Sequence, residues 1–287
     1  MRLRSDLILL LVTLLWGSAF AVMRVAAGHH TIFLLNGARF LLGGLLLLPW
    51  ARMRGAIHAG NRIYVLGAGF ALFAAVAFQQ AGLATTTAAN GGFITSLYVV
   101  IVPFLLWVVW RERPSLWVAV GVLLAVGGGF LLSTAGRMTI QPGDLFMLCG
   151  SFFWAFHVVI VGKAQGSIAP LPFAFGQFMV CGVLSLAAGL LLETPSRADL
   201  LFVLPAVLYT AVFSIALGFT LQVIAQRHTP TSDAALILSL ESVTAAAFGW
   251  LFLDEKLLPI QLAGCAMILA AVILVQLKNV ETRPHES

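Results

Sequence analysis

The chain has 287 residues, of which 61% are hydrophobic and only 9% are charged, and its formal net charge is +5. Soluble proteins are about 45–50% apolar and about 25% charged, so this composition leaves too few polar side chains to cover a water-facing surface. It therefore excludes a soluble enzyme and a disordered chain. The basic residues are scattered along the sequence and form no contiguous basic cluster, which argues against a nucleic-acid partner. The sequence predicts an integral membrane protein.

Ten apolar runs are each long enough to cross a bilayer as a helix, which takes roughly 20 residues. The runs are continuous and lack the alternation of an outer-membrane barrel. The loops between them are too short for a soluble domain, so we expect an all-α fold within the lipid bilayer. The expected transmembrane helices lie near residues 5–25, 31–49, 63–81, 90–109, 115–132, 144–162, 172–192, 200–224, 232–252 and 259–277.

The first run has some features of a signal peptide. Arg2 and Arg4 precede its apolar core, and the segment 19–21 resembles a cleavage site. We expect a retained helix instead, because the run is long enough to span and nine further spans follow.

Basic residues indicate how the chain is oriented, because they are enriched in cytoplasmic loops. With both termini cytoplasmic in the inner membrane, the cytoplasmic side holds eleven of them: Arg2, Arg4, Arg52, Arg54, Arg62, Arg111, Arg113, Lys163, Arg227, Lys278 and Arg283. The outer side then holds four: Arg24, Arg137, Arg197 and Lys256.

The chain also contains a weak internal repeat. A shift of 143 residues places 84–132 on 227–275, and a shift of 138 aligns the earlier spans. Five spans per repeat is an odd number, so the second repeat enters the membrane with opposite orientation. We expect two inverted repeats, residues 1–138 and 139–287, an arrangement typical of secondary transporters with a substrate site near the midplane. The matched residues are Trp16 with Trp154, Phe40 with Phe178, Gln79 with Gln222, Tyr98 with Glu241, and Glu112 with Glu255.

Four segments carry a resemblance to a known family: LLLVTLLWGSAFAVMRVA, GARFLLGGLLLLP, GLATTTAANGGFITSLYVVIVP and TPTSDAALILSLESVTAAAFGWLFLDEKL. They resemble the two EamA repeats of the drug/metabolite transporter (DMT) superfamily, with Glu112 and Glu255 as the most specific mark. Ser242 departs from the pattern, since the second repeat often has proline there. The chain looks most like the YddG-type aromatic amino-acid exporters.

The resemblance implies a ten-helix carrier that exports amino acids, aromatic and other apolar ones, by alternating access and without ATP hydrolysis. The alternative function within the same family is a multidrug or other metabolite efflux carrier. The alternative from a different functional class is an intramembrane enzyme. Independently, no GxxxxGK[ST] loop is present, so this chain is not expected to hydrolyse ATP by that route. The sequence also lacks long cytoplasmic segments that would couple to a separate ATPase, so no ATPase partner is evident, and no cofactor is expected. Cys149, Cys181 and Cys265 lack metal-ligand spacing, so no metal is expected either.

Three ionisable residues lie within spans, where charge is costly: Arg39, His157 and Glu241. Each is a candidate for binding substrate or for coupling transport to protons. For each, the structural alternative is a hydrogen bond or ion pair between helices, such as Glu241 with Arg39. Asp6, Asp144 and Asp233 lie at span ends, where a helix N-terminus favours a carboxylate, so we expect these to be structural.

Uncharged residues at matched positions complete the candidate substrate site. Trp16 and Trp154 can stack on a planar side chain or hold an ammonium. Tyr98 and Glu241 are expected to face each other across the pseudo-twofold axis, with Ser239 beside them. For the matched amides Gln79 and Gln222, packing between helices is the alternative to a substrate contact. The candidates that permit bending, and hence gating, are Gly91, Gly92 and Pro103.

Overall fold

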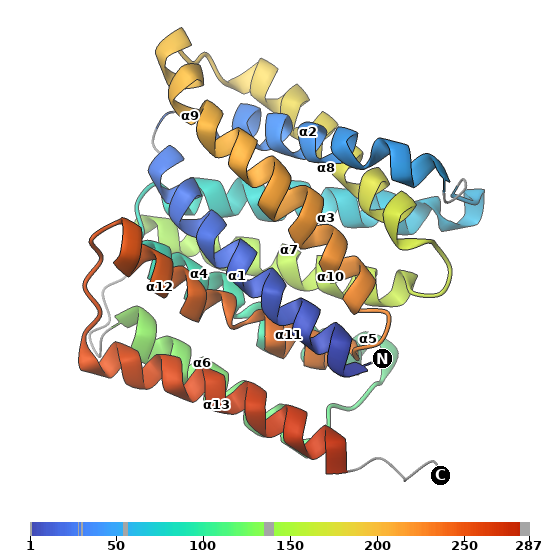
Figure 1. Ribbon diagram of the computed structural model, residues 1–287, viewed down its shortest axis with the longest axis vertical. Helices are drawn as coiled ribbons and strands as arrows, with labels where there is room; N and C mark the ends of the chain where they lie inside the picture. Colours follow the sequence, from blue (N-terminus) through green and yellow to red (C-terminus); the bar gives the residue numbers. More distant parts are fainter. Residues whose placement is uncertain (1, 28, 30, 54–56, 135–140, 282–287) are drawn as a thin grey trace.

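The computed structural model describes residues 2–27, 29, 31–53, 57–134 and 141–281, and every regular element in these ranges is a helix. Ten stretches of the described chain are long and apolar enough to cross a membrane, as the sequence predicts. The described chain starts, at the beginning of its first helix, and ends, at the end of its last helix, at the same end of the helix bundle, which we call the terminal end (Figure 1). The predicted repeat boundary at 138 falls outside the described residues, as do Arg54, Arg137, Arg283 and the side chain of Lys278.

The first repeat forms five spans from seven elements. Its third span begins with a short 3-10 turn, η1, and its fourth span is divided in two. The elements are α1 (Arg2–Ala26), α2 (Ile32–Met53), η1 (Ala59–Asn61), α3 (Arg62–Leu83), α4 (Ala88–Ser96), α5 (Tyr98–Trp110) and α6 (Leu116–Thr134).

The second repeat forms five spans from eight elements. Its third span contains a π-helix, η2, and its fourth span is again divided. The elements are α7 (Pro142–Ala164), α8 (Pro170–Leu192), α9 (Arg197–Thr210), η2 (Ala211–Phe219), α10 (Thr220–Ala225), α11 (Thr231–Leu238), α12 (Glu241–Phe252) and α13 (Pro259–Glu281).

Large apolar side chains cover much of the outer surface of this bundle. Leu66, Leu123, Leu145 and Leu191 are among many that are more than half exposed. Such a surface would cause aggregation in water, whereas in a bilayer it faces lipid tails. The helices therefore satisfy their backbone hydrogen bonds internally while their side chains meet the membrane.

The helix pairings follow the symmetry expected of two repeats. The second spans pair with each other, α2 on α8, and so do the fifth spans, α6 on α13 (Figure 1). The first span of each repeat packs on the third span of the other, α1 on α9–η2–α10 and α7 on α3. Exchanging the repeats thus reproduces the same set of contacts, which indicates a pseudo-twofold relation.

Small residues bring the fifth spans together. A Cβ added at Gly128 would lie 2.6 Å from the carbonyl oxygen of Gly264, and one at Gly264 would lie 2.4 Å from that of Gly128. Only glycine permits so close a backbone approach, which is how helices associate in membranes without a hydrophobic driving force. The small-residue stripes of these spans are thus packing surfaces.

The loops after the fourth spans end in matching turns. Arg111 and Asp254 have φ of 59° and 54° and are the non-glycine residues with positive φ in the described chain. The following residues, Glu112 and Glu255, donate their N–H groups to the carbonyls of Leu106 and Gly249 at 3.1 and 3.2 Å. Each pair of positions differs by 143 residues, so the repeat seen in the sequence is also a repeat in backbone geometry.

Candidate functional site

The fourth span of each repeat is interrupted at the same place. The α4–α5 break falls at Leu97 and the α11–α12 break at Ser239 and Leu240, positions related by the shift of 143. In both breaks a serine hydroxyl, that of Ser96 or Ser239, donates to the carbonyl three residues earlier at 2.7 Å. Each break is a single turn tightened to hydrogen bonds three residues apart, with Leu97, Ser239 and Leu240 still in the right-handed helical region. Tightened turns within a helix often mark hinges, and these two occupy matched positions in the repeats.

Each break places one functional side chain at the start of a half-helix. Tyr98 is the first residue of α5, and Glu241 is the first residue of α12. A carboxylate at a helix N-terminus is favoured by the helix dipole. Both side chains are buried and line one central cavity.

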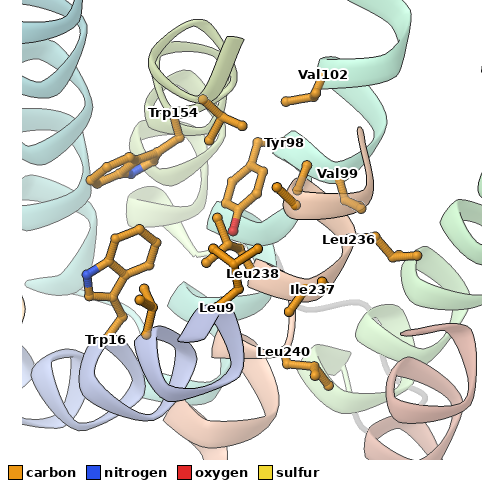
Figure 2. Close-up of a cluster of buried hydrophobic side chains, with 14 of the residues drawn as sticks. Leu9, Trp16, Tyr98, Val99, Val102, Trp154, Leu236, Ile237, Leu238 and Leu240 are labelled. Carbon is orange, nitrogen blue, oxygen red and sulfur yellow. The ribbon is translucent and has the colours of Figure 1, made fainter. Parts of the chain in front are cut away.

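The cavity lies among α1, α2, α3, α5, α7, α12 and the π-helix η2. Five of the predicted functional side chains, together with Arg39, line it. The full lining is Trp16, Ala19, Phe20, Met23, Arg39, Gln79, Leu83, Tyr98, Trp154, Val158, Ser214, Phe219 and Glu241. The Tyr98 ring lies between the two tryptophans and the apolar side chains of α11 (Figure 2).

Three aromatic rings form one wall of the cavity. The ring centroids of Trp16 and Trp154 are 6.3 Å apart. Phe219 stacks on Trp154 at 5.7 Å with an interplanar angle of 8°, and it lies 4.6 Å from Trp16. This arrangement presents flat apolar surface to whatever occupies the cavity. Phe219 was not predicted, because it comes from one repeat only and its counterpart is a valine.

The π-helix η2 supplies that phenylalanine and also anchors Trp16. The Trp16 indole N–H donates to the carbonyl of Ser214 at 3.4 Å. A Cβ at Gly218 would lie 2.7 Å from Trp16 Nε1, so glycine is needed for the indole to approach. π-helical segments are rare and frequently occur at functional sites.

Several polar groups of the residues that line the cavity lack a hydrogen bond of normal geometry, although the side chains of Tyr98 and Glu241 lie next to each other. The Tyr98 hydroxyl, the Trp154 indole N–H and Glu241 Oε1 are buried, and none has a hydrogen-bond partner among the described residues. Buried polar groups normally form hydrogen bonds with protein or water. Three unpaired polar groups around one cavity therefore indicate that a ligand or water molecules bind there. Arg39 Nε donates to Asn36 Oδ1 at 2.9 Å, and no ion pair joins Arg39 to Glu241 within the described chain.

The cavity is narrow as it stands. Its free volume is about 40 Å³, which is room for a few water molecules. Pockets that hold organic ligands are on the order of 300–1,000 Å³. The helices around the cavity must therefore separate before an organic molecule can enter.

Three predicted substrate residues lie outside the lining. His157 Nε2 is paired with Gln177 Oε1 at 2.9 Å, and the imidazole meets the rings of Trp154 and Phe219 edge-on behind the cavity wall. Gln222 is fully buried away from the cavity, although its counterpart Gln79 lines it. Ser239 bonds to the backbone within its own break.

The predicted gating residues surround the first break rather than occupying it. Gly91 and Gly92 lie in α4, and Pro103 lies within α5. A Cβ at Gly92 would lie 3.1 Å from the Cα of Ser242, so this glycine sets how closely α4 approaches α12. The break itself is carried by Leu97, which bonds to the carbonyl of Ile94 at 3.2 Å.

Similarity to known proteins agrees with this geometry. The chain is 36% identical over 278 residues to an "Uncharacterized transporter" of Archaeoglobus fulgidus, covering 96% of this chain and 87% of that protein. It is 26% identical over 285 residues to the "Uncharacterized inner membrane transporter YedA" of Escherichia coli K12, covering 92% and 88%. A known crystal structure shares the fold, with a TM-score of 0.77 at 20% identity, covering 99% of this chain and 100% of that one.

The sequence profile of the EamA-like transporter family matches the chain twice, over residues 3–134 and 141–277. The two matches coincide with the two sets of five spans, and together they cover nearly the whole protein. The chain is thus a multi-pass membrane transporter with two EamA repeats, and it belongs to the EamA-like transporter family of the DMT superfamily.

Proposed function

We propose that this transporter exports amino acids with aromatic or other apolar side chains by alternating access around the central cavity. The observation that carries the proposal is the lining itself, where Arg39 and Glu241 supply opposite charges that do not pair with each other. Both residues are nearly inaccessible to solvent, at 4% and 3% exposed. A charge held at membrane depth without a protein counterion favours a functional role.

Opposite charges in one cavity complement a zwitterion. A guanidinium binds a carboxylate through parallel N–H groups, which suits Arg39 for the substrate carboxylate. Glu241 then receives the substrate ammonium, and the Tyr98 hydroxyl provides a further acceptor beside it. The unpaired Glu241 oxygen and the Tyr98 hydroxyl gain partners when such a substrate binds.

The aromatic wall suits the substrate side chain. Trp154 and Phe219 are nearly parallel, and stacked aromatic pairs contribute about 0.5–1.5 kcal/mol beyond the area they bury. The trio with Trp16 also attracts an ammonium through the negative faces of the rings. Aromatic and large apolar side chains therefore gain more from this cavity than small polar ones.

With cytoplasmic termini, the proposed export carries the substrate from the terminal end of the bundle to the opposite end. From the sequence, we assign eleven basic residues of loops and termini to the membrane side that holds both termini and four to the other side, and this bias favours cytoplasmic termini in the inner membrane. Bending of α4 and α5 near Gly91, Gly92 and Pro103 would accompany opening of the cavity.

Of the coupling candidates, Glu241 has a better position than His157, because Glu241 lines the cavity whereas His157 is bonded to Gln177 behind the cavity wall.

The proposal is tested with proteoliposomes that contain the purified chain. Uptake of labelled phenylalanine, tryptophan, leucine, glycine and glutamate is measured with and without an imposed pH gradient. We expect saturable uptake that is strongest for the first three and absent from empty liposomes. The matched variants are Glu241→Gln in the cavity and Glu112→Gln in the ion pair with Lys163 outside it.

Each outcome decides one part of the proposal. Gradient-dependent uptake that Glu241→Gln uncouples and Glu112→Gln preserves would assign proton antiport to Glu241. Gradient-independent uptake would make the protein a facilitator. No uptake of any amino acid would overturn the substrate class and direct the search to other metabolites or drugs of the same family.

A further inference from the structure

Two partly buried polar clusters occupy symmetry-related positions at opposite ends of the bundle. The terminal cluster consists of Arg2, Asp6, Thr229 and Asp233, and the opposite cluster consists of Thr86, Asn90 and Asp144. The shifts that define the repeat convert one into the other: Asp6 to Asp144, Thr86 to Thr229, and Asn90 to Asp233. Each cluster joins the first span of one repeat to the fourth span of the other.

The opposite cluster is held by hydrogen bonds to a single carboxylate. Thr86 Oγ1 donates to Asp144 Oδ1 at 3.2 Å, and Asn90 Nδ2 donates to the same oxygen at 2.7 Å. Asn90 also bonds to the Ser133 hydroxyl on α6. These contacts attach the start of α7 to the start of α4.

The terminal cluster repeats this plan with one change. Thr229 Oγ1 donates to Asp6 Oδ1 at 2.7 Å, as Thr86 does to Asp144. Asp233 stands where the other repeat has Asn90, so a second carboxylate replaces the amide that donates to the first. Two carboxylates repel each other, and the Arg2 guanidinium bridges them, paired with Asp233 and 3.7 Å from Asp6 Oδ2.

Both clusters control half-helices that end at the cavity. α11 runs from the terminal cluster to the break before Glu241, and α4 runs from the opposite cluster to the break before Tyr98. Both clusters are closed in this structure, and the cavity between them has little free volume. Separating α1 from α11, or α7 from α4, would widen the cavity toward one end only.

We propose that these clusters are the two gates of the transporter, and that they open alternately. The terminal gate depends on Arg2, whereas the opposite gate closes through neutral donors. This inference rests on transport by alternating access, and it is independent of which substrate is carried. It assigns a function to three carboxylates, Asp6, Asp144 and Asp233, of which only Asp144 caps a helix in the described chain.

The test measures the width of each end by electron spin resonance in liposomes. The three native cysteines are first replaced by alanine. One spin-label pair, Leu3→Cys with His228→Cys, reports the terminal end, and a second pair, Ala84→Cys with Leu145→Cys, reports the opposite end. All four positions are exposed and outside both clusters.

We expect Arg2→Gln to leave Asp6 and Asp233 repelling each other and to raise the open population at the terminal end at least tenfold. The double variant Arg2→Gln with Asp233→Asn rebuilds the neutral arrangement of the opposite gate and should restore closure. Asn90→Asp should open the opposite end, since among the residues that the structure describes no arginine bridges the carboxylates there. Arg4→Gln, a change of an exposed arginine two residues from Arg2, is the matched control and should leave both ends closed.

The gate proposal is overturned if Arg2→Gln leaves the terminal distances unchanged, or if Arg4→Gln changes them as much. It is also overturned if the double variant stays as open as Arg2→Gln alone, because the rescue depends on removing like charge. Elution as a single symmetric peak in detergent confirms that each variant is folded. Amino-acid uptake by the unlabelled protein is recorded in parallel, so a wrong substrate class would leave the distance changes intact.

Discussion

At the two helix breaks, the repeats share the same turn and differ in the side chain that follows it. Ser96 and Ser239 make the same hydrogen bond, but the next half-helix begins with Tyr98 in one repeat and with Glu241 in the other. The second spans show the same contrast. Arg39 lines the cavity, whereas its counterpart by the shift of 138, Gln177, is bonded to His157.

The contrast extends to the third spans. α3 is a regular helix of 22 residues, whereas its counterpart is divided into α9, the nine-residue η2 and α10. η2 contributes Phe219 and the carbonyl that binds Trp16. The repeats thus provide a symmetric scaffold that can rock, and their unlike residues give the cavity a charged polarity and an aromatic wall. A symmetric cavity would bind a zwitterion equally well in two opposite orientations. In this cavity the charged residues differ between the repeats, so one orientation of the bound zwitterion is favoured.

The largest expected effect comes from removing the negative side of the cavity. Glu241→Gln retains the shape and deletes the charge that faces the substrate ammonium. Loss of one partner of a buried charge pair costs about 2–5 kcal/mol. At 1.4 kcal/mol per tenfold, substrate affinity should fall by roughly 30-fold or more. Competition binding in detergent measures this, and Glu112→Gln is the control outside the cavity. Unchanged affinity would exclude Glu241 from substrate binding.

Arg39, the positive side of the cavity, should contribute somewhat less to substrate binding than Glu241. Arg39→Gln makes the second span of the first repeat resemble that of the second repeat, where glutamine is native. Hydrogen bonds to charged groups are worth about 1.5–3 kcal/mol, so KM should rise by roughly tenfold to 100-fold. The matched control is Arg52→Gln at the exposed end of the same helix. Amino-acid amides lack the carboxylate that Arg39 is proposed to bind. If Arg39→Gln raised KM equally for amides and for free amino acids, the substrate carboxylate would not be the partner of Arg39.

The shared scaffold can be broken without touching the cavity. Gly264→Ala would place a Cβ 2.4 Å from the Gly128 carbonyl and 2.7 Å from the Leu132 nitrogen, both backbone atoms that cannot rotate away. Overpacking of this kind typically destabilises by about 1–3 kcal/mol. Thermal unfolding in detergent should shift downward by several degrees. Gly127→Ala meets only the flexible tip of Met267 at 3.3 Å, so an equal shift there would show that the Gly128–Gly264 contact is not special.

The features that the two repeats share could be predicted from the sequence, whereas several features in which the repeats differ could not. Hydropathy predicted ten spans, and the matched positions of Trp16 and Trp154 indicated two rings that the structure brings within 6.3 Å. The same reasoning placed Gln222 at the same depth as Gln79 and made both amides candidates for the substrate site. The π-helix that precedes Gln222 changes the rotation per residue, so the amide turns away from the face that an α-helix would give it.

No sequence pattern marks that π-helix, which is why Phe219 and the Ser214 carbonyl were not anticipated. The polar clusters were missed for a different reason. Asp6, Asp144 and Asp233 lie near expected span ends, where a helix N-terminus is a sufficient explanation for a carboxylate in the sequence. Only Asp144 forms a capping box in the described part of the chain, and only the packing of α1 on α11 and of α7 on α4 brings the partners of all three together.

The smallest expected effect tests the asymmetry at η2 itself. Gly218→Ala would place a Cβ 2.7 Å from Trp16 Nε1 and push the indole away from the Ser214 carbonyl and from Phe219. Because an aromatic contact is worth about 0.5–1.5 kcal/mol, uptake of phenylalanine and tryptophan should weaken by roughly twofold to tenfold. Leucine should be affected less, since it gains little from stacking. Gly67→Ala on α3 is the matched control, because its Cβ meets Ile160 at an ordinary 3.5 Å. A uniform loss for all amino acids would mean that Trp16 supports the fold and does not select the side chain, whereas a loss confined to aromatic substrates would show that a feature of one repeat alone sets specificity.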